Sequence, residues 1–201
     1  MASTIEFYFD FSSPYSYIAS EQIEALAART ASPLQWRPIL LGAVFKASGG
    51  APLTEVYGPK ARYAVRDFAR SAAFVGVPYR HPTTFPIGAV AASRAVLWLQ
   101  REHSAKATPY IHAVYRAFFV DDRNVGDATV ALDIAQSLGI DTARLAAGVQ
   151  EEAIKTALRV QVEQAIARDV FGAPTIFVDG EMFWGHDRLD QVERWISRGP
   201  F

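Results

Sequence analysis

Strand-like segments occur only near the two ends of this chain of 201 residues, and this placement constrains the fold more than any other feature. Residues 5–11, IEFYFDF, are aromatic-rich and alternating, which is typical of a β-strand. Ser13 and Pro14 follow as an N-cap and a first helical residue, and apolar residues then support a helix to about Thr30. A second strand, interrupted by Pro38, is predicted over 34–41, LQWRPILL. Together these segments predict a βαβ unit, whose crossover is right-handed in almost every known case.

The middle of the chain differs, because it has helical periodicity and almost no strand signal. Helices are predicted near 59–75, 88–104, 107–120, 127–138, 142–147 and 150–170. Strand character returns in a β-hairpin around an Asp179-Gly180 turn, and an amphipathic helix over 188–197 ends the chain. We therefore predict an α/β fold in which one domain, residues 1–43 and 171–201, is interrupted by an inserted all-helical domain, residues 44–170.

The composition excludes several classes of function. The net charge is −1 and half of the residues are hydrophobic, which gives no basis for binding nucleic acid or a membrane. The absence of cysteine excludes disulfides, thiol nucleophiles and zinc–thiolate sites. The four histidines show no metal-ligand spacing, so no metal site is expected. Glu6 and Asp10 interrupt the first apolar run, which does not fit a signal peptide, and a cytoplasmic location is expected.

Basic residues are concentrated between Pro59 and Lys106, where acidic residues are few. Arg62, Arg66 and Arg70 lie four residues apart, so a helix would align them in one stripe. Such a stripe is usually a solvated face. The alternative is a site for a small molecule with a carboxylate, which the planar guanidinium group suits.

Two short motifs lie where ligands bind in α/β proteins. Ser13 follows the end of a strand in the βαβ unit, at a helix N-terminus whose unpaired N–H groups favour an anion. A serine in this position is most often only a cap. Pro174 opens a strand in Gly172-Ala173-Pro174-Thr175, where a cis peptide is one way to accommodate it, although trans is far commoner.

These features together resemble the thioredoxin fold of the disulfide oxidoreductase DsbA, with a βαβ unit, a helical insertion and a ββα unit. In that family the turn before the first helix holds Cys-Pro-x-Cys, whereas this chain has Ser13-Pro14-Tyr15-Ser16. Hydroxyl groups cannot exchange disulfides, so a redox role for the protein alone is excluded. The resemblance implies a site for a thiol supplied by a cofactor.

Three stretches, FYFDFSSPYSYIA, PKARYAVRDFAR and GAPTIFVDGEMFWGHDRL, are similar to the 2-hydroxychromene-2-carboxylate isomerases and the related kappa-class glutathione transferases. The similarity covers essentially the whole chain, and its most specific elements are Asp-Phe-x-Ser-Pro at 10–14 and Trp-Gly-x-Asp-Arg at 184–188. It implies a glutathione-dependent cis–trans isomerase of aromatic catabolism, with glutathione as cofactor, a small aromatic substrate and a homodimeric state.

The resemblance also implies roles for single residues. Ser13 would be catalytic, with its hydroxyl group donating to the glutathione sulfur, whose thiolate adds to the conjugated double bond of the substrate. Ala173, before a cis Pro174, would pair its backbone with the glutathione cysteinyl residue. A helix N-terminus lowers the pKa of a thiol near it, which agrees with the role given to Ser13.

The remaining implied site residues lie elsewhere in the chain. His186 and Asp187 occupy the place where the family binds the γ-glutamyl end of glutathione. Lys60 matches a family lysine beside the thiol and the substrate, and we interpret Trp184 as a wall of the substrate pocket.

One departure from the family pattern leaves the substrate open. The family usually carries an asparagine before that lysine, whereas this chain reads Gly49-Gly50-Ala51-Pro52 there and has a single asparagine, Asn124, far away. Two alternatives to the isomerase are also open, because related enzymes share a thiolate site and because fold alone does not determine function. One is a kappa-class transferase that conjugates glutathione to electrophiles, and the other is a non-catalytic thioredoxin-like binding or chaperone module.

Overall fold

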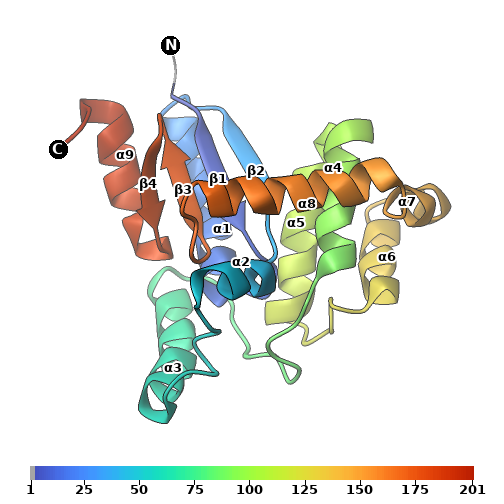
Figure 1. The fold of residues 1–201 in the computed structure, drawn as a ribbon, viewed down its shortest axis with the longest axis horizontal. Helices are drawn as coiled ribbons and strands as arrows, with labels where there is room; N and C mark the ends of the chain where they lie inside the picture. Colours follow the sequence, from blue (N-terminus) through green and yellow to red (C-terminus); the bar gives the residue numbers. More distant parts are fainter. Residues whose placement is uncertain (1–2) are drawn as a thin grey trace.

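Four strands form one mixed sheet in the order β2-β1-β3-β4, in a computed structural model that describes residues 3–201. β1 (Ile5–Phe9) and β2 (Leu34–Pro38) pair in parallel. β3 (Thr175–Val178) lies antiparallel to β1, and β4 (Glu181–Trp184) lies antiparallel to β3. The first and last strand units of the chain thus meet in the centre of the sheet (Figure 1), as the predicted βαβ and ββα units require.

Helices occupy the chain between β2 and β3 and complete both outer units. Their bounds are α1 Pro14–Arg29, α2 Leu41–Ser48, α3 Gly58–Phe74, α4 Val90–Glu102, α5 Ser104–Phe119, α6 Ala128–Ser137, α7 Thr142–Gly148, α8 Glu152–Ala167, the 3₁₀ turn η1 His186–Arg188 and α9 Leu189–Arg198. The helices predicted from periodicity are present with ends shifted by a few residues. Asp179 and Gly180 both have positive φ, 52° and 89°, as the tight hairpin turn between β3 and β4 requires.

Helix α2 was not predicted, and the predicted second strand was too long. The strand ends at Pro38, and Leu41 already belongs to α2. The N-cap residue of α2, Leu40, makes no side-chain hydrogen bond to the helix. Instead the Leu41 N–H donates to Asp10 Oδ2 at 2.7 Å. The capping group therefore comes from the end of β1, which no pattern local to 34–48 reveals.

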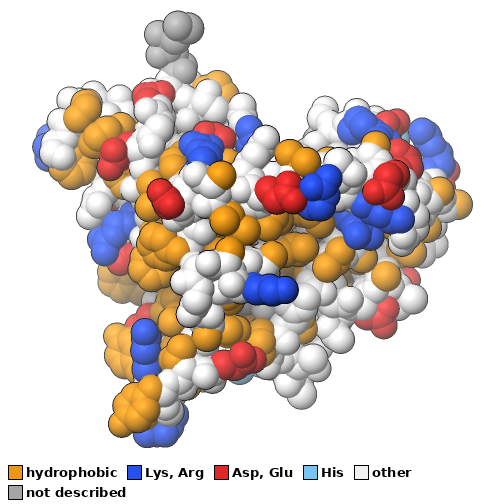
Figure 2. Space-filling model, in the orientation of Figure 1, with side chains coloured by type: hydrophobic (Ala, Val, Ile, Leu, Met, Phe, Trp, Pro, Cys, Tyr) orange, Lys and Arg blue, Asp and Glu red, His pale blue; other side chains and the backbone are white. Residues whose placement is uncertain are grey.

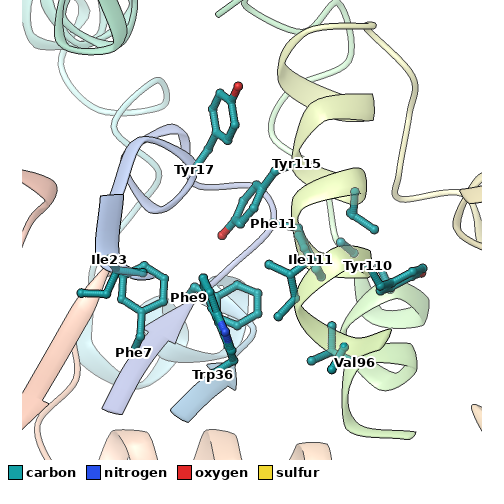
Figure 3. Packing of buried hydrophobic residues seen from close by; sticks show 14 of the residues in the cluster. Phe7, Phe9, Phe11, Tyr17, Ile23, Trp36, Val96, Tyr110, Ile111 and Tyr115 are labelled. Atoms are coloured by element: carbon teal, nitrogen blue, oxygen red, sulfur yellow. The ribbon is translucent and has the colours of Figure 1, made fainter. Parts of the chain in front are cut away.

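Alternation along β1 directs its side chains into two separate apolar clusters. Phe7 and Phe9 lie on the side of α1, where they pack with Trp36 and with the helical block (Figure 3). Tyr8 lies on the opposite face, in a cluster with Phe177 and the buried side of α8. The sheet is thus covered on both faces, as in other α/β folds.

The larger cluster continues from the sheet into the helical block without a break. The ring of Phe11 lies 5.1 Å from that of Tyr115 on α5, and Phe9 lies 6.0 Å from it (Figure 3). The predicted boundary between residues 43 and 44 falls inside α2, and the division into two domains stays a prediction. Within residues 3–201, no helix is both long and apolar enough to cross a membrane.

Candidate active site

Ser13 is buried, with 5% of its surface exposed, at a point where the two strand units meet. Its Oγ accepts a hydrogen bond from the Ser16 N–H at 3.1 Å and donates to the Ala173 carbonyl at 2.9 Å. The first contact caps α1. The second contact joins the start of α1 to the segment before β3, 160 residues later. Ser13 is therefore a cap and also a link to the second predicted motif.

The Ala173–Pro174 peptide bond is cis, the form that the resemblance implied. The Pro174 carbonyl accepts from the Gly185 N–H at 3.0 Å, so both sides of this proline are held by neighbouring segments. The Phe85–Pro86 bond is also cis, and Ser12 Oγ accepts from the Ile87 N–H at 3.1 Å. The segment with Pro174 is thus hydrogen-bonded to the end of β4, and the segment with Pro86 is hydrogen-bonded to the residues before α1.

A cavity of about 950 Å³ opens beside these residues. Four of the predicted site residues, Ser13, Lys60, Ala173 and Trp184, line it. They come from the N-cap of α1, from α3, from the segment before β3 and from β4, which are distant in sequence. Trp184 is 49% exposed and packs edge-to-face with Phe171, also a lining residue, at a ring separation of 4.9 Å. An aromatic pair therefore stands in the more open part of the wall.

The other predicted residues, Pro174, His186 and Asp187, lie outside the lining of the cavity. Pro174 follows Ala173 in the chain. The ring of His186 lies 4.8 Å from that of Tyr15, which does line the cavity. Burial lowers the pKa of His186, which favours a neutral ring. Asp187 is exposed and pairs with Arg188 at 3.2 Å, so it is the predicted residue least connected to the cavity.

Asp10 also lines the cavity, although the sequence motif gave it no role. Its Oδ1 accepts from the Ser12 N–H at 2.6 Å and its Oδ2 from the Leu41 N–H at 2.7 Å. Burial raises the pKa of Asp10 to about 6, although both hydrogen bonds act in the opposite direction. Its place in the Asp-Phe-x-Ser-Pro motif is the signal in the sequence that could have pointed to Asp10. Its hydrogen-bond partner on α2, Leu41, is seen only in the structure.

Most of the remaining wall is apolar. It comes from α2, the segment before α3, the segment before α4 and the first residue of α4, through Leu41, Phe45, Leu53, Val56, Phe85, Ile87 and Val90. Gly49, Gly50, Ala51 and Pro52, at the place where the resemblance implied an asparagine, also line the cavity. Asn124 does not line it and instead accepts from the Gly126 N–H in a turn, at 3.1 Å. This part of the site thus has small and apolar groups where an amide was expected.

Charged groups are few in this lining. Among the described residues that line the cavity, Lys60 is the one basic side chain, and Asp10 and Glu55 are the acidic ones. Arg62, Arg66 and Arg70 are exposed on α3 and lie outside the lining, so the arginine stripe is a solvated face. In residues 3–201, no three His, Asp or Glu side chains lie close enough together to hold a metal ion. The lining therefore offers the Ser13 hydroxyl group at a helix N-terminus, the Asp10 carboxyl group and one ammonium group for chemistry.

Comparison with known proteins assigns this arrangement to a class. The family model described as DSBA-like thioredoxin domain matches residues 4–197, so the fold and the site define a DsbA-like thioredoxin domain. The chain is 33% identical over 197 residues to the 2-hydroxychromene-2-carboxylate isomerase of Sphingobium xenophagum, which covers 98% of this chain and 99% of the relative. It is 25% identical over 213 residues to glutathione S-transferase kappa 1 of Rattus norvegicus, covering 98% and 94%.

A solved structure of a 2-hydroxychromene-2-carboxylate isomerase superposes with a TM-score of 0.86 at 28% identity, covering 97% of this chain and 95% of that chain. The chain belongs to the DsbA-like family and, within it, to the group of the 2-hydroxychromene-2-carboxylate isomerases. The resemblance stated from the sequence is thereby confirmed at the level of the family.

Proposed function

We propose that this protein is a glutathione-dependent isomerase that acts on 2-hydroxychromene-2-carboxylate or a similar aromatic carboxylate. The relative at 33% identity is named as that isomerase, and kappa-class glutathione transferases are also relatives. One observation carries the proposal: a buried serine hydroxyl at the N-terminus of α1 lies in a cavity that also contains a lysine. We also propose that the protein is a cytoplasmic homodimer.

The residues present fit an anionic thiol. The first turn of α1 presents the positive end of a helix dipole, and Ser13 adds a hydroxyl donor there. The cavity, at about 950 Å³, lies at the upper end of the range of roughly 300–1,000 Å³ for small-ligand sites, which leaves room for a tripeptide beside an aromatic ring. Glutathione would be held by Ser13, by the Ala173 backbone before Pro174, and by His186 and Asp187. It would supply a thiolate nucleophile.

The hydrogen bonds of Ser13 determine where its hydroxyl group can donate a proton. Its Oγ accepts from the Ser16 N–H, so its own hydrogen is the one it can donate. In this structure that hydrogen is directed at the Ala173 carbonyl. If the Ala173 carbonyl accepts from a backbone N–H of a ligand, the Ser13 hydroxyl group is free to turn and donate to an anionic sulfur. Binding at Ala173 and stabilisation by Ser13 would then be coupled.

Lys60 and the apolar wall suit the other ligand. Lys60 lines the cavity but is exposed to solvent, so its ammonium group would attract a carboxylate less strongly than a buried charge would. The side chains of α2 and of the segments around the starts of α3 and α4 favour a planar ring. Trp184 and Phe171 would border that ring. The single basic group indicates a substrate with one carboxylate rather than several.

A kappa-class transferase is the second candidate, because relatives with that name match nearly the whole chain. It would use the same thiolate and differ only in releasing the conjugate intact. A non-catalytic module is less well supported, since it gives no reason for a buried serine and a lysine to share one cavity.

The proposal is tested by glutathione titration in a calorimeter, with the thiolate absorbance of the bound cofactor followed against pH. Wild type and Ser13→Ala should both bind, but only wild type should lower the thiol pKa. Ser20→Ala is the matched control, because Ser20 is also buried on α1 but donates to the Tyr17 carbonyl away from the cavity. No binding by wild type at millimolar glutathione would refute the proposal. If binding is found, isomerisation of 2-hydroxychromene-2-carboxylate separates isomerase from transferase.

A further inference from the structure

Tyr15 connects the start of α1 to α3. It follows Ser13 and Pro14 in the chain and lines the cavity. Its hydroxyl group donates to Asp67 Oδ2 in the middle of α3, at 2.6 Å. We propose that this hydrogen bond fixes α3 against α1 and thereby positions Lys60 relative to Ser13. The hydrogen bond between Tyr15 and Asp67 does not depend on the proposed function. Only the roles given to Lys60 and Ser13 rest on the proposed function.

Helix α3 has few other attachments to the molecule. It packs mainly against α1, and it projects from the lower left of the molecule in Figure 1, between two irregular segments, 49–57 and 75–89. Part of its surface faces solvent, with Tyr63 60% and Phe74 90% exposed, and apolar and basic side chains alternate over this region in Figure 2. An element with few buried contacts opens at a lower free energy than the core.

Two contacts of different character join the buried side of α3 to Tyr15, and Phe68 also packs on His81 and Phe85 outside α1. Phe68 is 2% exposed, and its ring meets that of Tyr15 edge-to-face at 5.0 Å. Aromatic pairs prefer this edge-to-face geometry over a range of ring separations, so the contact defines the position of α3 less sharply than a hydrogen bond between two atoms does. The Tyr15–Asp67 bond is directional and involves a charged acceptor, which makes it one of the stronger types of hydrogen bond. It therefore defines the orientation of α3 more sharply than the Phe68 contact does.

Asp67 is itself held in place on α3. Arg70 pairs with its Oδ1, one turn further along the helix. Although partial burial opposes ionisation, the hydrogen bonds from Tyr15 and Arg70 outweigh it and lower the pKa of Asp67. Asp67 is therefore a fixed, charged acceptor at neutral pH.

The position of Asp67 on α3 determines which residue the Tyr15–Asp67 hydrogen bond positions. Lys60 lies seven residues before it, which is two turns or roughly 10 Å along a helix, and it lines the cavity. Because a helix transmits position along its length, fixing Asp67 to Tyr15 fixes Lys60 relative to α1. Ser13 is two residues before Tyr15 at the other end of the same connection. Asp67 is thus a positioning residue, and Tyr15 connects it to the site.

The test is a double-mutant cycle with Tyr15→Phe, Asp67→Ala and the double variant. Phenylalanine keeps the ring contacts with Phe68 and His186, and alanine is a good helix former that does not by itself weaken α3. Amide hydrogen exchange over residues 58–74 is measured by mass spectrometry. Tyr17→Phe is the matched control, because Tyr17 on α1 donates its hydroxyl to the Pro78 carbonyl at 2.8 Å, outside α3.

Each single variant should speed exchange in 58–74 by about tenfold, as expected for the loss of a hydrogen bond to a charged group. The double variant should be no faster than either single variant, because both remove the same contact. Arg70→Gln, which keeps the Tyr15 contact, should have a smaller effect. Exchange no faster than in Tyr17→Phe, or additive effects of the two changes, would overturn the proposal.

A kinetic measurement separates positioning from general loss of structure. Tyr15→Phe and Asp67→Ala should raise KM for 2-hydroxychromene-2-carboxylate severalfold, with kcat within about twofold, because Lys60 is displaced while Ser13 is not. An equal loss in kcat would contradict this role for Lys60. If wild type neither binds glutathione nor isomerises the substrate, the proposed function fails, and the exchange cycle alone decides the role of the Tyr15–Asp67 bond.

Discussion

The carboxyl group of Asp10 joins β1 to α2 inside the cavity wall, where it accepts from the N–H groups of Ser12 and Leu41. Its pKa in the folded protein is raised by burial to about 6, against an ordinary value of 3.8. The folded state therefore keeps this proton to a higher pH than the unfolded state. The stabilising contribution of Asp10 is complete below about pH 3.8 and is lost as the pH rises through about 6.

This linkage predicts a difference in pH dependence between wild type and Asp10→Asn, which cannot titrate. Between pH 4 and pH 8, wild type should lose on the order of 3 kcal/mol of unfolding free energy relative to Asp10→Asn, from the separation of the two pKa values. Urea unfolding at several pH values measures it. A constant offset between the two proteins across this range would show that Asp10 titrates normally.

Gly172 sets the position of Trp184. A Cβ atom at Gly172 would lie 2.6 Å from Trp184 Nε1, whereas a Cβ atom at Gly42, which also lines the cavity, meets nothing within 4 Å. Gly172→Ala should therefore displace the indole ring, change the tryptophan fluorescence and weaken binding in the cavity severalfold. Gly42→Ala should leave both unchanged and stabilise α2 by up to about 1 kcal/mol. Equal binding by the two variants would mean that Trp184 takes no part in the site.

At the scale of elements, His112 connects α5 to α1 through two carboxylates. Its Nδ1 lies 3.1 Å from Glu21 Oε1 and its Nε2 lies 2.5 Å from Glu24 Oε1. Burial lowers the pKa of His112, but the hydrogen bonds to Glu21 and Glu24 outweigh burial and raise it. For a raised histidine pKa, the stabilising contribution is complete below the unfolded value near 6.5 and is lost as the pH rises through the folded value.

His112→Gln should therefore lower the unfolding free energy by about 1 kcal/mol at pH 5.5 and by much less at pH 9. Urea unfolding at the two pH values provides the measurement. His103→Gln is a suitable control, since His103 has no carboxylate partner within the described residues. A loss for His112→Gln that does not depend on pH would indicate that packing of the ring against Trp36, rather than charge, joins the two helices.

Elements with local signals were predictable from the sequence, and elements that depend on distant partners were not. The start of α1 follows from Ser13 and Pro14, because cap and first-turn preferences act within a few residues. The β3–β4 turn follows from Asp179 and Gly180 for the same reason. Helix α2 was missed because its capping acceptor is Asp10, 31 residues earlier. A leucine-rich segment without a local cap is indistinguishable from a buried strand by periodicity alone.

The same distinction applies to the candidate site at the scale of the whole molecule. Ser13, Lys60, Ala173 and Trp184 were found through motifs, and the structure brings them to one cavity. The roles of Asp10 and Tyr15 were not found, because they follow from partners on α2 and α3 that the motifs do not contain. The cavity itself needs both strand units and the helical segment between them, so no single stretch of sequence specifies it.

The contacts between the strand units and the helical segment also determine how the whole chain unfolds. The sequence divides into a β-rich part and a helical part, but Phe9 and Phe11 pack against Tyr115 in one continuous cluster. A continuous core favours a single cooperative transition. Phe11→Ala, which removes a ring that is 1% exposed in this cluster, should cost about 3–5 kcal/mol and destabilise both parts equally.

Single-tryptophan variants provide the measurement. Trp98 on α4 reports on the helical part, and Trp195 on α9 reports on the part next to the sheet. Each variant keeps either Trp98 or Trp195 as its only tryptophan. The midpoint of urea unfolding measured by tryptophan fluorescence should coincide with the midpoint measured by far-ultraviolet circular dichroism. The two midpoints should also coincide when Phe11→Ala is added. Two separated midpoints, with Phe11→Ala shifting one of them, would instead establish the helical segment as an independently folding domain inserted into the thioredoxin-like one.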